Sequence, residues 1–135
     1  MAIINTLQKC LDSPYLFKDD DAPAKIPNLL AKAADRLEAA ANIQFTGQGD
    51  AADISFLCYE AMFSCLRALV YQKGYREAGF RCLLLACENL YVRAGTLEAD
   101  HIHAIERVQS LKSPPDESLA LASAFVRRTL EILGQ

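Results

Sequence analysis

Glycine and proline are scarce in this chain, and their scarcity excludes two kinds of protein. The 135 residues include only 6 glycines and 5 prolines, too few for a collagen-like or linker composition. Hydrophobic residues make up 52% of the chain, which excludes intrinsic disorder. A single domain of this length buries enough surface to fold without a disulfide or a metal ion.

The chain also lacks an excess of positive charge and a long uncharged apolar run. Its net charge of −3 argues against a surface that binds nucleic acid throughout, so we expect no DNA partner and at most a local basic patch. No segment reaches the ~18–20 uncharged apolar residues of a membrane span, so we expect no membrane contact.

No secretory signal is recognisable at the start of the sequence. The apolar residues between Met1 and Leu11 follow no basic region, and no small-residue cleavage site precedes the acidic run at residues 19–21. We therefore expect a cytoplasmic protein whose cysteines are reduced. The five cysteines are Cys10, Cys58, Cys65, Cys82 and Cys87.

Several motifs that carry chemistry are missing as well. The sequence has no CxxC pair, no glycine-rich phosphate loop and no serine elbow. His101 and His103 are two residues apart on a predicted helix, so their rings point to nearly opposite sides, whereas a helical zinc pair needs a step of three or four. Cysteines on apolar helices behave as small hydrophobes. We expect no metal and no cofactor.

Helical periodicity is what the sequence does contain. Apolar residues recur at steps of three and four from Ile26 onward, and the pattern returns in segments 51–73, 80–93, 97–111 and 116–133. Short connections between long helices predict an all-α, up-and-down bundle of four to five helices. We assign residues 24–135 to this bundle, and residues 1–23 to a short helix and an acidic linker.

Turn and cap residues predict where these helices begin and end. Asp50 is placed to cap the helix at 51–73, and Gly95 is the expected left-handed residue after the helix at 80–93. Ser113 is the expected cap of the last helix. Leu111 is expected to face inward from the helix at 97–111.

Segment 51–73 is apolar almost all round, which predicts a central helix. Its charges Asp53, Glu60 and Arg67 are seven apart and so lie along one line. Two apolar stripes suggest that one face serves the core and the other a second copy of the chain, so we expect a homodimer. The stripes are Ile54, Cys58, Ala61, Cys65 and Ala68, and Phe56, Phe63 and Val70.

The candidate ligand-binding residues are Glu60, Arg67, Arg76 and Arg81. Arginines in this arrangement suit a phosphate-bearing or carboxylate ligand. The alternative is that these charges face water or pair with one another, Glu60 with Arg67 and Arg81 with Glu88.

The middle of the chain resembles a known family. Residues 59–70 read YEAMFSCLRALV and residues 72–76 read QKGYR, similar to the second long helix and turn of HEPN domains. Residues 90–97 look like the end of the next helix of that family, and residues 116–133 resemble its closing helix. The HEPN superfamily comprises small all-α proteins of prokaryotes and some eukaryotes.

The resemblance implies a helical bundle that is commonly homodimeric. Many HEPN members are metal-independent ribonucleases and toxins paired with a nucleotidyltransferase antitoxin, and others bind nucleotides, RNA or partner proteins. Active members carry an arginine followed a few residues later by a histidine. In RNA cleavage the histidine would handle a proton and the arginine would stabilise phosphate charge.

This chain departs from the active pattern at the histidine. Arg76 stands where the arginine is expected, but the histidine position reads Phe80, followed by Arg81, and neither side chain transfers protons at neutral pH. We therefore expect a non-catalytic binding or regulatory module for a nucleotide, an RNA phosphate or a partner protein of the nucleotidyltransferase type. The alternatives are a metal-independent ribonuclease with an altered site and a purely structural helical partner.

Overall fold

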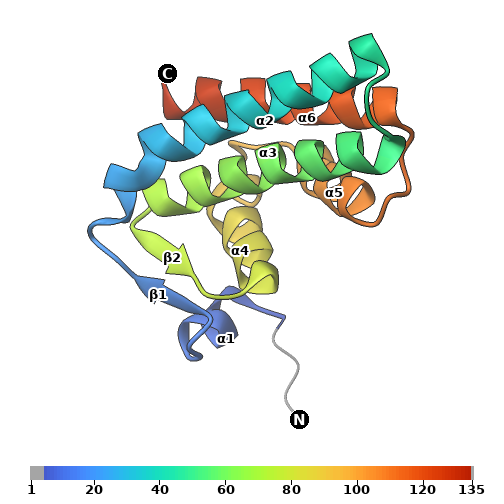
Figure 1. The fold of residues 1–135 in the computed structure, drawn as a ribbon. Helices are drawn as coiled ribbons and strands as arrows, with labels where there is room; N and C mark the ends of the chain where they lie inside the picture. Colours follow the sequence, from blue (N-terminus) through green and yellow to red (C-terminus); the bar gives the residue numbers. More distant parts are fainter. Residues whose placement is uncertain (1–4, 135) are drawn as a thin grey trace.

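The computed structural model describes residues 5–134, and these residues are mostly helical, which confirms the all-α prediction (Figure 1). The up-and-down bundle of HEPN type stays a prediction. The helices are α1 Leu7–Leu11, α2 Ile26–Thr46, α3 Ala51–Gln72, α4 Phe80–Cys87, α5 Ala99–Gln109 and α6 Pro115–Leu133, with a 3-10 turn at Ala22–Lys25 and a π-helical turn at Glu88–Val92. Two short strands, β1 Leu16–Lys18 and β2 Tyr75–Glu77, pair antiparallel.

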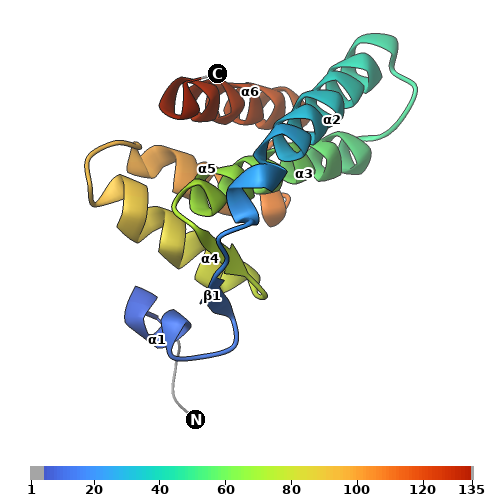
Figure 2. The same ribbon diagram turned by 90° about the vertical axis from the view of Figure 1, so that its left-hand side faces the viewer.

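Helix α3 is the centre of the molecule and contacts α2, α4, α5 and α6. Figure 1 shows α2, α3 and α6 running alongside one another, and Figure 2 shows α4 and α5 on the other side of α3, with α1 beyond α4. By length and composition alone α3 is apolar enough to cross a membrane, but 67% of its most apolar window is buried inside the fold. It has the burial of a core helix.

The first apolar stripe of α3 supplies much of the core. All five of its residues, from Ile54 to Ala68, are buried. The second stripe is divided, because Val70 is buried while Phe56 is 60% exposed. The molecule therefore leaves part of one α3 face open to solvent.

Two of the predicted cap positions are confirmed and one is wrong. The Asp50 carboxylate accepts a hydrogen bond from the Asp53 backbone N–H at 2.9 Å. In return, the Asp53 carboxylate accepts one from the Asp50 backbone N–H at 3.2 Å. Gly95 has a left-handed φ of 80°. Ser113, however, does not cap α6, because its buried hydroxyl is hydrogen-bonded to the Ser118 hydroxyl at 2.7 Å.

Leu111 does not face inward as predicted. It is 62% exposed and has a left-handed φ of 59°, which is unusual for a residue with a side chain. The chain ends α5 at Gln109 and turns sharply here, so Leu111 leaves the buried face of the helix. The helix predicted at 80–93 is also divided, since α4 gives way to the π-helical turn at Glu88.

The N-terminal segment contains a short helix, as expected, but it also contains a strand and a disulfide that the sequence did not predict. Residues 1–4 of the predicted 1–23 segment lie outside the described residues. Within the rest, α1 and β1 pack on the bundle, and a disulfide joins Cys10 to Cys82, so the expectation of five reduced cysteines is wrong for this pair. The sequence could not reveal the bond because the two cysteines are 72 residues apart. Cys58, Cys65 and Cys87 are free and buried.

Candidate functional site

The four predicted ligand-binding residues lie in three places. Glu60 and Arg67 line one cavity along α3, and Arg81 lines a second between α4 and α5. Arg76 lies on β2, where its guanidinium is 3.7 Å from the Asp19 carboxylate. The structure therefore does not bring all four side chains to one site.

The first cavity, which we call the α2–α3 cavity, has a volume of about 270 Å³. Its charged lining residues are Lys32 from α2 and Glu60 and Arg67 from α3. Glu60 is paired with Arg36 at 3.4 Å, so the Glu60–Arg67 pair that the sequence allowed is not the one formed.

Arg67 is held in place from two sides. Its Nε donates to the Glu77 carboxylate at 3.0 Å, and its guanidinium carbon lies 4.4 Å from the centre of the Phe63 ring. Glu77 also accepts from the Tyr71 hydroxyl at 2.7 Å, and its side chain is only 5% exposed. Burial, together with this hydrogen bond, raises the pKa of Tyr71 to about 12.

Glu77 positions Arg67, and the sequence did not single it out as a candidate residue. In the sequence it was one acid among the basic residues of the turn that follows α3, with no periodic pattern to place it. Its role depends on the pairing of β1 with β2, which brings this short segment against the bundle. A three-residue strand carries too little alternation to be read from one sequence.

An aromatic cluster of Tyr59, Phe63 and Phe80 joins α3 to α4. The Phe63 and Phe80 rings are stacked with centres 5.6 Å apart, and Tyr59 lies 5.9 Å from each of them. Phe80, at the position where the resemblance implies a histidine, is therefore a packing residue that anchors the start of α4.

The second cavity, which we call the α4–α5 cavity, is larger, at about 430 Å³. Phe80 also borders it, so the aromatic cluster lies between the two cavities. Three cationic side chains line this cavity and only one acid does: Arg81, Arg107 and Lys112, with Glu106. Arg107 is paired with Glu117 at 2.7 Å, and both side chains remain substantially solvent-accessible.

The histidines and free cysteines lie apart from these cavities. His101 packs 5.5 Å from the Phe125 ring and 3.6 Å from the Glu98 carboxylate, whereas His103 is exposed. Burial raises the pKa of the Cys65 and Cys87 thiols to about 12, so neither is a thiolate nucleophile at neutral pH. Within residues 5–134, no group of three or more histidine, cysteine, aspartate or glutamate side chains is placed to hold a metal ion.

Cationic side chains line both cavities, and an aromatic cluster lies between them. Arginine and lysine suit phosphate oxygens, and an aromatic edge suits a base or ring. Comparison with protein-family models, with curated proteins and with solved structures found no match to this chain.

Proposed function

We propose that this chain is a non-catalytic binding module of HEPN type whose ligand carries phosphate and docks in the α4–α5 cavity. The observation that carries the proposal is the convergence of Arg81, Arg107 and Lys112 on one cavity of about 430 Å³ beside Phe80. The lining of this cavity has three cations, of which Arg107 is paired with Glu117, and one acid, which still favours an anion. The neighbouring Phe80 offers an apolar edge for a base, since its ring is stacked on Phe63.

The helical core supports the HEPN-like form of the proposal. Helix α3, which contains the segment that resembles HEPN domains, packs against α2 and α6 along its length. The homodimer is proposed with it, and is supported by the open part of α3. There Phe56, 60% exposed, and Leu111, 62% exposed, border an apolar cavity of about 320 Å³.

The non-catalytic form is supported by Phe80, which occupies the position where the resemblance implies a histidine, and by the contacts of His101. Phe80 is stacked in the aromatic cluster, and a phenyl ring transfers no proton. His101 contacts Phe125 of α6 and the Glu98 carboxylate. A ribonuclease with an altered site is the alternative that the experiment below separates.

The test is titration calorimetry with ATP and with a 5′-phosphorylated oligoribonucleotide as probes. The double substitution Arg81→Gln and Lys112→Gln should weaken binding about tenfold or more, because two charge-assisted contacts are lost. Arg127→Gln is the matched control, since Arg127 is an exposed arginine of α6, and it should leave the affinity unchanged.

Two other results would overturn the proposal. RNA cleavage that disappears in Arg76→Ala would establish the ribonuclease instead. A protein that binds neither probe, but forms a stable complex with a coexpressed protein in sedimentation experiments, would establish the structural role. Sedimentation equilibrium of the purified chain tests the dimer separately.

A further inference from the structure

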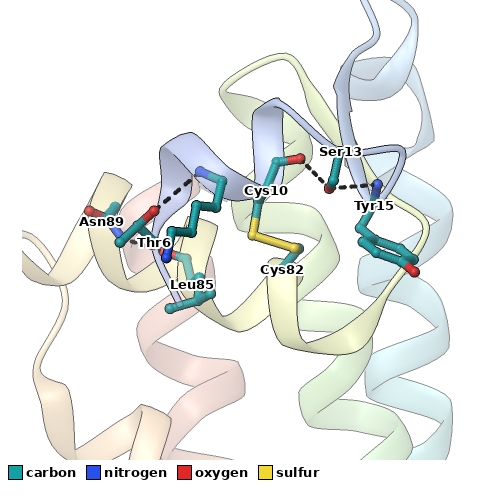
Figure 3. Close-up of a disulfide and its surroundings, with 8 residues drawn as sticks. Thr6, Cys10, Ser13, Tyr15, Cys82, Leu85 and Asn89 are labelled. Carbon is teal, nitrogen blue, oxygen red and sulfur yellow. Dashed lines mark hydrogen bonds between the residues drawn. A yellow bond between two sulfur atoms is a disulfide. The ribbon is translucent and has the colours of Figure 1, made fainter. Parts of the chain in front are cut away.

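The disulfide between Cys10 and Cys82 fastens α1 onto the start of α4 (Figure 3). Both cysteines are buried: Cys10 is 0% exposed and Cys82 is 2% exposed. Their Cα atoms are 5.6 Å apart. Figure 3 shows α1 lying across α4, with Thr6 near Leu85 and Asn89 of the neighbouring turns.

Helix α1 is a short element that packs on the bundle through few buried side chains. It is only 5 residues long, and Cys10 is its one buried residue, while Leu7 and Leu11 are half-buried. Isolated helices shorter than ~12 residues are marginal in water, so α1 depends on its contacts with the bundle, of which the disulfide is the covalent one.

The neighbouring strand β1 is held independently of the disulfide. Leu16 is buried at 1% exposure, and β1 pairs with β2 through all three of its residues. At its ends, the Ala78 N–H donates to the Tyr15 carbonyl at 2.8 Å and the Asp19 N–H donates to the Gly74 carbonyl at 2.9 Å. The two halves of the N-terminal segment therefore depend on different interactions.

We propose that the Cys10–Cys82 disulfide is a redox latch, whose reduction by a dithiol releases α1 from α4 while β1 stays paired with β2. Both sulfurs are buried, so the exchange takes place when α1 opens transiently from α4. A thiolate of the dithiol then attacks one sulfur, which forms a mixed disulfide and frees the other cysteine. The second thiol of the reductant then displaces the remaining cysteine. Two electrons and two protons pass to the protein, and the dithiol leaves as a cyclic disulfide.

No other cysteine in residues 5–134 competes for this exchange. Cys58, Cys65 and Cys87 are buried in the core, and burial raises their thiol pKa values well above neutral.

The test is amide hydrogen exchange, followed residue by residue by NMR, in the oxidised protein and in the same protein with dithiothreitol. The reporters in α1 are the amides of Cys10 and Asp12, which donate to the Thr6 and Gln8 carbonyls. They should exchange about tenfold faster or more on reduction. The amides of Asp19 and Ala78 should keep their oxidised rates, since they report on β1.

Variants separate the latch from a general effect of the reductant. Cys10→Ser should show fast α1 exchange with and without dithiothreitol, whereas Cys87→Ala should keep the full redox response. Equal α1 protection in both states would overturn the proposal. A simultaneous loss of amide protection at Ala78 and across α3 would also overturn it, because the disulfide would then stabilise the whole fold rather than α1 alone.

Discussion

The Glu77 carboxylate holds two side chains at once, although it comes from a strand of only 3 residues. Replacing it in Glu77→Ala leaves the Tyr71 hydroxyl without its acceptor and frees Arg67 from its ion pair. We expect a loss of about 2 kcal/mol in the free energy of unfolding, because a buried hydroxyl that loses its partner retains its desolvation cost. Urea denaturation at neutral pH measures this loss.

The matched control is Glu117→Ala, which removes a more exposed ion pair with Arg107. Exposed pairs contribute less than about 1 kcal/mol, so this variant should stay close to the parent protein. Equal losses of stability in the two variants would show that the buried contacts of Glu77 contribute no more than an exposed ion pair.

Leu111 has a left-handed backbone conformation, which costs free energy in a residue that carries a side chain. Glycine adopts this conformation without strain, so Leu111→Gly should be more stable than Leu111→Ala by about 1 kcal/mol. Both variants remove the same exposed side chain beyond Cβ, which makes alanine the appropriate reference. Thermal unfolding of the pair measures the difference, and an alanine variant as stable as the glycine variant would contradict it.

The candidate site was predictable only where it lies on long helices. Glu60 and Arg67 share one line on α3, and the structure keeps both on one cavity because helical spacing fixes their directions. Arg107 and Lys112 were missed, since they join Arg81 only through the packing of α5 against the rest of the fold. Contacts between distant segments leave no local spacing to read.

At the scale of elements, α3 begins with a reciprocal cap between Asp50 and Asp53. Asp50→Ala should lower the free energy of unfolding by about 1 kcal/mol, because the N–H groups of the first turn lose their acceptor. Asp35→Ala is the control, since Asp35 is an exposed aspartate inside α2, and its effect should stay within about 0.5 kcal/mol. Equal costs at the two positions would contradict the capping role.

The long helices were predictable because their periodicity is sustained, and α2, α3 and α6 begin and end close to the residues that the sequence indicated. The two short strands were not predictable, and for residues 1–23 the sequence indicated a short helix without its bounds. Strands β1 and β2 are stabilised by pairing across the chain, and α1 by a disulfide to α4, so their stability comes from tertiary contacts rather than from local sequence. The mistaken cap at Ser113 has the same origin, since Ser118 competes for its hydroxyl.

At the scale of the whole molecule, three buried thiols link stability to alkaline pH. Burial raises the pKa of Cys58 from 9.0 to about 11, and those of Cys65 and Cys87 to about 12. In the unfolded chain these thiols ionise near 9, so between pH 9 and about 12 the folded state binds more protons than the unfolded state. Stability is therefore fully present below pH 9 and is lost as the pH rises.

We expect the free energy of unfolding to fall steeply above pH 9. Each thiol contributes up to about 1.4 kcal/mol per pH unit, so the three together approach a slope of about 4 kcal/mol per pH unit near pH 10. Urea denaturation under argon, at steps from pH 7 to pH 11, measures the slope while excluding oxidation of the thiols.

Cys87→Ala separates this thiol linkage from a general alkaline effect. The variant loses one buried ionisable group, so its slope should be smaller by up to about 1.4 kcal/mol per pH unit, whatever its stability at pH 7. Ionisation of exposed lysines and tyrosines would affect the parent and the variant alike. A slope that Cys87→Ala leaves unchanged would therefore show that the folded state does not raise the pKa of this thiol.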